Sequence, residues 1–377
     1  MHDAVDAHTT GLDGPSKATL ALSPAACARL SGVHTLTLRS MACLRGMLVA
    51  PPPPGAFFPR LRSLLLLLFH DRKGGGEIED PADYQAIAST ASVLTELSMT
   101  PPASATALPQ QMAALLVACS KLISLAIIYP LRGDDMALVD VGALSVGTQL
   151  QRLKLGYCLR LSDLAPLGAM VNLQSLDLHR CDAVSDLTPL TAMVQLQNLQ
   201  MHFCSAFSDL APLAAMVKLQ SLDISSCYGV SDLAPLAAMV KLQSLDLHGC
   251  MAVSDLVPLA AMVNLQNLDI FGCTGVSDLA PLRAMVDLQT LNTVRCTGVS
   301  DLTPLTAMVK LQKLHLRSCN AASDLAPLAY MVKLQNLDIV GCTGVSDLAS
   351  LTRMVSLESL DISGCVAVSD VTPLTEL

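Results

Sequence analysis

The segment LQSLDLHGCMAVSDLVPLAAMVN, residues 242–264, is one copy of a unit that recurs through the second half of the chain. Ten such units run from Leu150 to Leu377 with a period of 23 residues, and the last is two residues short. In each unit the first apolar residues alternate with polar ones, which predicts a short, half-buried strand. A Ser-Asp pair and a proline follow, and they predict the start of a short 3₁₀ or α segment.

The same leucine spacing continues upstream in a less regular form. The longer units there leave room for an α-helix over residues 108–118, with Pro109 in its first turn. The matching stretches are Leu61-x-x-Leu64-x-Leu66, Leu94-x-x-Leu97-x-Met99, Leu122-x-x-Leu125-x-Ile127 and, more weakly, Val33-x-x-Leu36-x-Leu38. We therefore expect one continuous solenoid of about fourteen units.

Three segments divide the chain. We expect residues 1–29 to be a disordered lead or a weak cap, residues 30–149 to hold irregular repeats of 28–33 residues, and residues 150–377 to hold the ten regular repeats. The proline run 51–54 and the glycine run 74–76 predict loops between units.

Together these repeats resemble leucine-rich-repeat proteins. The Cys-x-x-[Val/Ala]-[Ser/Thr]-Asp phase is similar to the cysteine-containing repeats of F-box proteins, and Asp-Leu-x-Pro-Leu is similar to internalin repeats. The combination, as in LQNLDIFGCTGVSDLAPLRAMVD (residues 265–287), most resembles the leucine-rich-repeat proteins of trypanosomatid protozoa. The resemblance implies an α/β solenoid, a horseshoe or arc with a parallel concave sheet and short 3₁₀ or α segments on its convex side.

Composition restricts the class of function. The net charge of −9 argues against sequence-independent nucleic-acid binding, which needs clustered Lys and Arg. The most apolar run, residues 64–69, is too short to span a membrane, so we expect no membrane insertion. Ten cysteines recur once per unit at one phase, which indicates buried, reduced thiols rather than disulfides. These thiols, and the lack of a visible secretory signal, predict a cytoplasmic location, with the nucleus as the alternative.

Positions that vary between repeats on the predicted concave face are the candidate partner-binding residues. Phe203 and Phe271 are expected to be apolar anchors, flanked by histidines. Asp223, Asp246 and Asp269 are predicted to stack on adjacent strands as an acidic stripe, although a solvated aspartate copied by duplication would produce the same pattern. The complete set is Tyr157, His179, Arg180, His202, Phe203, Asp223, Asp246, His248, Asp269, Phe271, Arg295, Lys313, His315 and Arg317.

A basic cluster is expected one to two repeats after the acidic stripe. It consists of Arg295, Lys313, His315 and Arg317, and a partner with complementary charge order would be held in register by it.

The sequence predicts no catalytic, metal or cofactor site. Asp177 and His179 would share one face of a strand, but such neighbours form neither a cleft nor an oxyanion site. His179 and His202 would supply only two metal ligands.

We therefore expect a non-enzymatic scaffold that binds a protein partner through the concave face. Two alternatives remain: a substrate-recognition adaptor of a ubiquitin ligase recruited through residues 1–60, and a surface or secreted repeat antigen. End-to-end self-association through the uncapped last repeat is a further expectation.

Overall fold

The computed structural model describes residues 34–38, 62–66, 87, 93–99, 110–128 and 140–376. The predicted lead over residues 1–29 and the predicted loops at 51–54 and 74–76 lie outside the described residues. The chain groups into two compact units, of which unit 1 ends at Cys181 and unit 2 starts at Asp182. This division does not fall at residue 149, where the predicted change from irregular to regular repeats lies.

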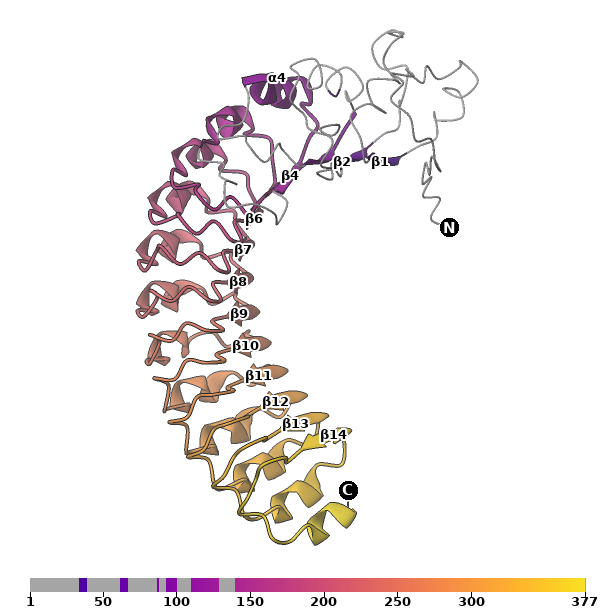
Figure 1. Ribbon diagram of the computed structural model, residues 1–377, viewed down its shortest axis with the longest axis vertical. Helices are drawn as coiled ribbons and strands as arrows, with labels where there is room; N and C mark the ends of the chain where they lie inside the picture. Colours follow the sequence, from indigo (N-terminus) through magenta and orange to yellow (C-terminus); the bar gives the residue numbers. More distant parts are fainter. Residues whose placement is uncertain are drawn as a thin grey trace, which may run out of the picture. The chain divides into compact units, whose positions relative to one another are not determined.

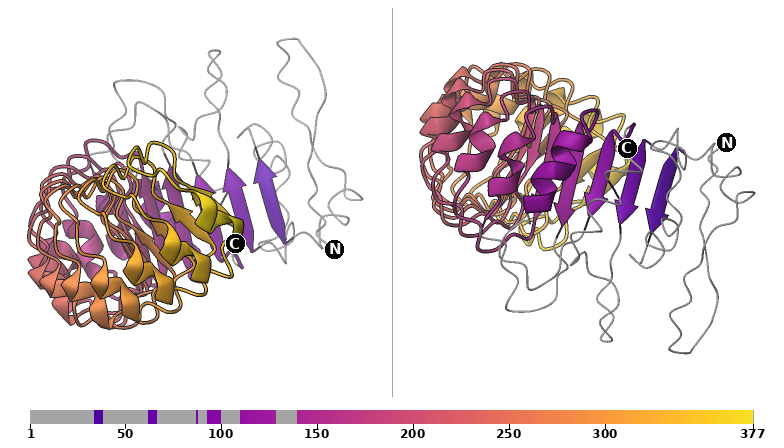
Figure 2. Two further views of the ribbon diagram at one scale, coloured as in Figure 1. Left: turned by 90° about the horizontal axis from the view of Figure 1, so that it is seen from below. Right: turned by 90° about the horizontal axis from the view of Figure 1, so that it is seen from above.

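The described residues of unit 1 form six parallel strands, each paired with the next one in chain order. Figure 2 shows these strands side by side and pointing the same way. The predicted helix is present as α4 (Gln110–Ala118), and its first two predicted residues are not described. The other elements are β1 (Thr35–Leu38), β2 (Ser63–Leu66), β3 (Glu96–Met99), β4 (Ser124–Ile128), β5 (Arg152–Gly156), β6 (Ser175–Asp177) and the 3₁₀ helices η1 (Gly142–Val146) and η2 (Ala165–Ala169).

Unit 2 contains eight short parallel strands in chain order, and Figure 1 shows them on one side of the unit with 3₁₀ helices on the other. The strands are β7 (Asn198–Gln200), β8 (Ser221–Asp223), β9 (Ser244–Asp246), β10 (Asn267–Asp269), β11 (Thr290–Asn292), β12 (Lys313–His315), β13 (Asn336–Asp338) and β14 (Ser359–Asp361). The helices are η3 (Thr188–Ala192), η4 (Ala211–Ala215), η5 (Ala234–Ala238), η6 (Val257–Leu259), η7 (Ala280–Ala284), η8 (Thr303–Ala307), η9 (Ala326–Tyr330), η10 (Ala349–Arg353) and η11 (Thr372–Glu376). The expectation of short 3₁₀ segments is confirmed.

The core is a set of aliphatic columns, because equivalent residues of successive repeats pack on one another. In unit 2, Leu222, Leu245 and Leu268 pair directly across adjacent strands and are each 1% exposed. A column of methionines, one per repeat, closes the core near the helices, since Met216, Met239, Met262, Met285 and Met308 are all fully buried. Each repeat therefore completes its core against its neighbours.

One aspartate per repeat starts each 3₁₀ helix. In unit 2, Asp255 Oδ1 accepts the backbone N–H of Val257 at 2.8 Å, and Asp278 Oδ1 accepts that of Ala280 at 2.7 Å. The helix N-cap residue is the intervening leucine, so the bond comes from the residue before the cap. This bond satisfies a backbone donor that the short helix leaves open.

The cysteines form a ladder of thiol hydrogen bonds. Cys250 Sγ donates to the carbonyl of Ile224 in the preceding repeat at 3.2 Å, and Cys342 Sγ donates to that of Leu316 at 3.0 Å. All ten repeat cysteines are free and buried, as the sequence predicts. Burial raises the pKa of Cys250, Cys296 and Cys342 to about 12 each. At neutral pH these thiols are protonated and unreactive.

We predict that iodoacetamide will leave Cys250, Cys296 and Cys342 unmodified in the native protein, because only the thiolate reacts and only when exposed. Cys365, which is 7% exposed in the last repeat, should react first among the ladder cysteines. Peptide mass spectrometry after timed quenching measures this, with urea-unfolded protein as the control that labels every site. Labelling of Cys250 as fast as Cys365 would contradict the thiol ladder.

Candidate binding surface

The sheet of unit 2 exposes a surface that we call the strand face. It consists of the fifth, seventh and eighth positions of each repeat, counted from the repeat's first leucine. In the repeat of residues 242–264 these positions are Asp246, His248 and Gly249. Strand pairing places the fifth positions in one column, in the order Asp223, Asp246, Asp269, Asn292, His315, Asp338 and Asp361. The predicted stacking of Asp223, Asp246 and Asp269 on adjacent strands is therefore present.

These aspartates also shape the backbone. Asp246 Oδ1 accepts the N–H of His248 at 2.9 Å, and Asp269 Oδ1 accepts that of Phe271 at 2.8 Å. Asn292 does the same with Val294 at 3.1 Å. A side-chain oxygen bonded two residues ahead turns the chain out of the strand. The aspartate column thus has a structural role that the alternation pattern did not reveal.

Most of the aspartates on this surface also have a partner for their charge or for the second oxygen. His202 Nδ1 lies 3.4 Å from Asp223 Oδ2, and Arg317 donates to Asp338 Oδ2 at 3.2 Å. Asn292 Nδ2 donates to Asp269 Oδ2 at 2.8 Å. Among the described residues, Asp246 alone of the three stacked aspartates has neither an ion pair nor a hydrogen bond to its second oxygen, although His248 interacts with its charge.

The electrostatic cost is concentrated on Asp246. Its pKa is raised to about 6, chiefly by burial, and the negative charges of Asp223 and Asp269 add to this effect. The backbone N–H of His248 and the charge interaction with its ring act in the opposite direction but are outweighed. Like charges about 5 Å apart repel by roughly 3 kcal/mol at an effective dielectric constant of 20, and by less where water has access. An incoming cation would relieve this repulsion.

An aromatic and cationic stack lies along the same repeats. The His248 and Phe271 rings stack at 4.3 Å between centroids with an interplanar angle of 17°, and the Arg295 guanidinium lies 5.7 Å from the Phe271 centroid. Phe271 is partly exposed. The three side chains come from three successive repeats, so together they present one flat, partly apolar patch beside the acidic column.

Phe203, the other predicted anchor, is 39% exposed. Its ring lies edge-on to that of His202, with centroids 5.9 Å apart. It therefore presents apolar area to solvent near Asp223, at the start of unit 2.

The predicted basic cluster is partly neutralised. Arg317 and His315 both face Asp338, at 3.2 Å and 3.9 Å from its Oδ2 atom. Lys313 is exposed, and Arg295 is engaged with Phe271. The sequence placed these four residues close together, but it did not show that Asp338 pairs with two of them.

The predicted residues of unit 1 form a separate, mostly closed group. Lys154 Nζ and His179 Nδ1 contact the carboxylate of Asp177 at 2.6 Å and 2.7 Å. Burial alone would raise the pKa of Asp177, but the hydrogen bonds from His179 and Lys154 outweigh burial and lower the pKa to about 2. His179 is only 7% exposed, so it offers a partner little of its ring.

Tyr157 and Arg180 complete this group. The Tyr157 ring meets that of His179 edge-on at 4.9 Å, and the Arg180 guanidinium lies 6.0 Å from the Tyr157 centroid. The group therefore contains mutually packed side chains around a buried ion pair.

The eighth position has an unexpected backbone constraint. In every regular repeat it has a positive φ, between 55° and 75°. Four repeats place glycine there, and Tyr157, Arg180, Phe203, Ser226, Arg295 and Ser318 adopt the same conformation with a side chain. An L-residue in this region costs about 1 kcal/mol or more. The variation between glycine and larger residues at this position does not by itself reveal the positive φ.

Within the described part of the chain, His, Cys, Asp and Glu form no group of three or more that could hold a metal ion. The described helices also include none with the length and apolar character needed to cross a membrane.

Comparison with known proteins gives a fold. No family model matches the chain, and no curated protein matches it in sequence. Among solved structures, an internalin, InlF, from Listeria monocytogenes is similar with a TM-score of 0.60 and 21% identity, over 88% of this chain and 96% of that one. InlJ from Listeria monocytogenes, whose functional domain includes a cysteine ladder, has a TM-score of 0.53 and 18% identity over 77% of this chain and 58% of that one. A leucine-rich-repeat protein of Leptospira interrogans has a TM-score of 0.51 and 15% identity over 74% of each chain.

The chain has the leucine-rich-repeat fold. At these identities the likeness extends to the fold alone; the three structures come from Listeria monocytogenes and Leptospira interrogans, and the predicted trypanosomatid resemblance stays a prediction. In leucine-rich-repeat terms, the strand face is the variable side of each repeat, and the buried leucines, methionines and cysteines are its constant framework.

We predict that Asp246→Asn stabilises this leucine-rich-repeat protein at pH 7 by about 1 kcal/mol, after allowing for solvent screening of a partly exposed group. Asparagine retains the acceptor for the His248 N–H, as Asn292 does in its own repeat, and removes the unfavourable charge. Because the folded pKa is raised above the unfolded value, the gain is present above pH 6 and disappears as the pH falls below 4. Urea denaturation of both proteins at pH 7 and at pH 4 measures this.

The matched control is Asp338→Asn, which removes the partner of Arg317 and should not stabilise at pH 7. A stability gain for Asp246→Asn that is equal at both pH values would contradict the electrostatic explanation.

A second prediction concerns the eighth position. Gly341→Ser should lower the free energy of unfolding by about 1 kcal/mol, and Ser318→Gly should raise it by a smaller amount, because both residues have positive φ. A Cβ atom on Gly341 would meet only Ser318 Oγ at 3.7 Å, an ordinary contact, so backbone strain is the relevant difference. Urea denaturation measures both variants, and effects of the same sign would refute the strain argument.

Proposed function

We propose that this chain is a non-enzymatic scaffold that binds a partner protein through the strand face of unit 2. The observation that supports this most is the exposed stack of His248, Phe271 and Arg295 beside Asp246, an aspartate that forms no ion pair among the described residues. Binding hot spots commonly combine an aromatic anchor with a desolvated charge at the centre of an interface.

The partner surface that fits is basic and partly apolar. A Lys or Arg side chain placed over Asp246 would relieve its repulsion from Asp223 and Asp269, which gives the cation more than an ordinary surface ion pair would. An aliphatic or aromatic group beside it would cover Phe271. Phe203 offers a second apolar contact two repeats before His248.

The aspartate that carries the binding charge also costs stability. This combination is expected of a functional residue, since replacing it would improve folding while weakening recognition. A residue with only a structural role would lose stability when replaced.

We predict that Asp246→Asn combined with Phe271→Ala lowers recovery of the partner at least tenfold in affinity purification from the native cell. The Asp246→Asn change removes the charge that attracts the partner, and the Phe271→Ala change removes the apolar anchor. Quantitative mass spectrometry of the captured proteins measures recovery. Binding should also weaken as the pH falls from 7 to below 6, because the pKa of Asp246 is about 6 and protonation removes its charge.

The control bait is the Arg283→Ala variant. Arg283 is an exposed residue of η7, on the helix side of unit 2, so this variant should recover the partner as the wild type does. The separate Phe203→Ala variant tests the second apolar contact. Equal recovery by the wild type and the double variant would exclude the strand face of unit 2 as the binding surface.

Two further properties belong to this proposal. The free, buried cysteine ladder supports a reducing compartment, the cytoplasm or else the nucleus, and alkylation of thiols in intact cells tests it, since oxidised ladder cysteines would contradict it. Self-association through the last repeat also belongs to this proposal, and a monomer in sedimentation at micromolar concentration would contradict it.

A further inference from the structure

Two neighbouring repeats depart from the pattern of the others on the helix side of unit 2. Ser350 stands where the other nine regular repeats have proline. Tyr330 and Arg353 stand where the first seven have alanine. The prolines are Pro166, Pro189, Pro212, Pro235, Pro258, Pro281, Pro304, Pro327 and Pro373, and the alanines are Ala169, Ala192, Ala215, Ala238, Ala261, Ala284 and Ala307.

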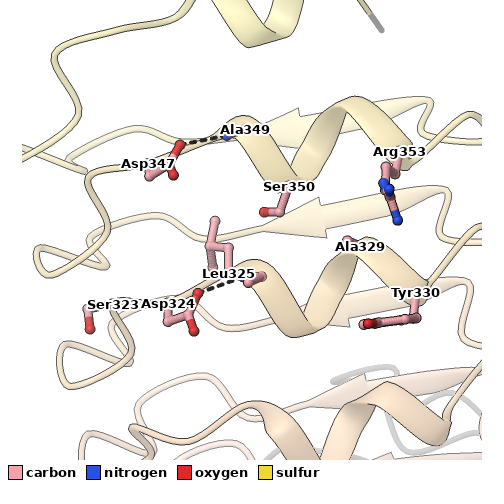
Figure 3. Close-up of a pocket in the computed structure, with 10 residues that line it drawn as sticks. Ser323, Asp324, Leu325, Ala329, Tyr330, Asp347, Ala349, Ser350 and Arg353 are labelled. Carbon is pink, nitrogen blue, oxygen red and sulfur yellow. Dashed lines mark hydrogen bonds between the residues drawn. The ribbon is translucent and has the colours of Figure 1, made fainter.

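These three departures gather around one groove. It lies between η9 and η10, has a volume of about 320 Å³ and is lined by all three residues together with Asp324 and Asp347. Figure 3 shows Tyr330 and Arg353 at one end of the two helices and Asp324 and Asp347 at the other, with Ser350 between them. Ala326 and Ala349 contribute small apolar side chains to the lining. The three positions that differ from the other repeats thus all line the same groove.

Ser350 is the least explained residue of the groove. Its Oγ atom is buried and has no hydrogen-bond partner among the described residues. An unpaired buried hydroxyl costs about 1–3 kcal/mol, whereas the proline of the other repeats would have no such cost and suits the first turn of a helix. The side chain points from η10 toward η9, into the space between them. A ligand in the groove that offers a hydrogen bond would satisfy this hydroxyl.

The charges at the two ends are not satisfied within the described chain. Asp324 and Asp347 each use Oδ1 to accept the N–H that starts the helix, from Ala326 and Ala349 at 2.8 Å. Neither carboxylate forms an ion pair among the described residues, and Arg353 forms none with any described side chain. The Tyr330 side chain is 59% exposed beside Arg353. The groove therefore has an acidic end, a basic end and an exposed aromatic ring.

We propose that this groove binds an extended peptide segment that carries a basic side chain and an acidic side chain four positions apart. The basic side chain pairs with Asp324 and Asp347, and the acidic one pairs with Arg353, whose guanidinium suits a carboxylate. From Asp347 to Arg353 the chain advances roughly 12 Å, at about 2 Å per residue of 3₁₀ helix. An extended peptide covers about 13 Å in four residues, and side chains four positions apart lie on the same face of it. Tyr330 packs on the peptide beside its acidic side chain, and the Ser350 hydroxyl bonds the peptide backbone between the two charges.

This site is separate from the strand face. It uses the helix side of repeats eight and nine, whereas Asp246 and Phe271 belong to β9, β10 and the turns that follow them. A partner held at both places would gain from two weak contacts on one chain.

Binding of three labelled heptapeptides to the full chain tests the proposal by fluorescence anisotropy at low ionic strength. The first is acetyl-AKAAAEA-amide, the second replaces both charged residues by glutamine, and the third retains glutamate alone. We expect the first peptide to bind at least about tenfold more tightly than either of the others. The triple variant Tyr330→Ala, Ser350→Pro, Arg353→Ala should weaken its binding at least tenfold.

Each change in the triple variant restores the residue of the other repeats, so the variant should fold at least as stably as the wild type, which its urea denaturation midpoint verifies. If it does not, Arg353→Ala alone serves the same purpose. Arg283→Ala on η7 and the strand-face pair Asp246→Asn, Phe271→Ala are the controls that should leave peptide binding unchanged.

Three outcomes would overturn the proposal: no saturable binding of the first peptide up to about 1 mM, equal affinity for the neutral peptide, or equal affinity of the wild type and the triple variant. Binding of the glutamate-only peptide as tightly as the first would mean an anion site at Arg353, and would overturn the two-charge arrangement. None of these results depends on whether the strand face binds a partner.

Discussion

In-register pairing of parallel strands is the constraint on which the rest of this structure depends. It places each residue directly beside its counterpart in the next repeat, so any property of one repeat is multiplied along the array. Leucines then stack on leucines and methionines on methionines, which builds the core. The cysteine thiols reach a carbonyl of the preceding repeat for the same reason. The cost is that charged residues also meet their copies.

The column of aspartates at the fifth position shows how the repulsion between stacked charges is reduced. The carboxylate is retained because its Oδ1 atom turns the chain at the end of each strand. Its second oxygen lies beside a different group from repeat to repeat, His202, Asn292 or Arg317. Asp246 forms no ion pair and no hydrogen bond to its second oxygen among the described residues, and burial together with its two acidic neighbours raises its pKa to about 6. The aspartate that turns the chain at the end of each strand thus leaves, at Asp246, a negative charge suited to binding a basic partner.

The two candidate sites lie on opposite sides of the repeats, and both combine side chains from neighbouring repeats. On the strand face the frame tolerates variation, and His248, Phe271 and Arg295 combine into a patch that spans three repeats. On the helix side the frame is nearly invariant, so the departures at Tyr330, Ser350 and Arg353 stand out. In both places a site needs residues from neighbouring repeats, because one repeat of this size offers too small a surface.

The sequence by itself determined the solenoid, the strand and 3₁₀ positions, the leucine and methionine core, the buried free thiols and the stacking of Asp223, Asp246 and Asp269, because each follows from a local period that parallel pairing translates into contacts. It did not reveal the positive φ at the eighth position, since glycine and phenylalanine both occur there. It also did not show which cations neutralise Asp338, that His179 is buried, or that Ser350 and Arg353 line a groove with Tyr330. Those features depend on side-chain directions across neighbouring repeats, which only the tertiary structure decides.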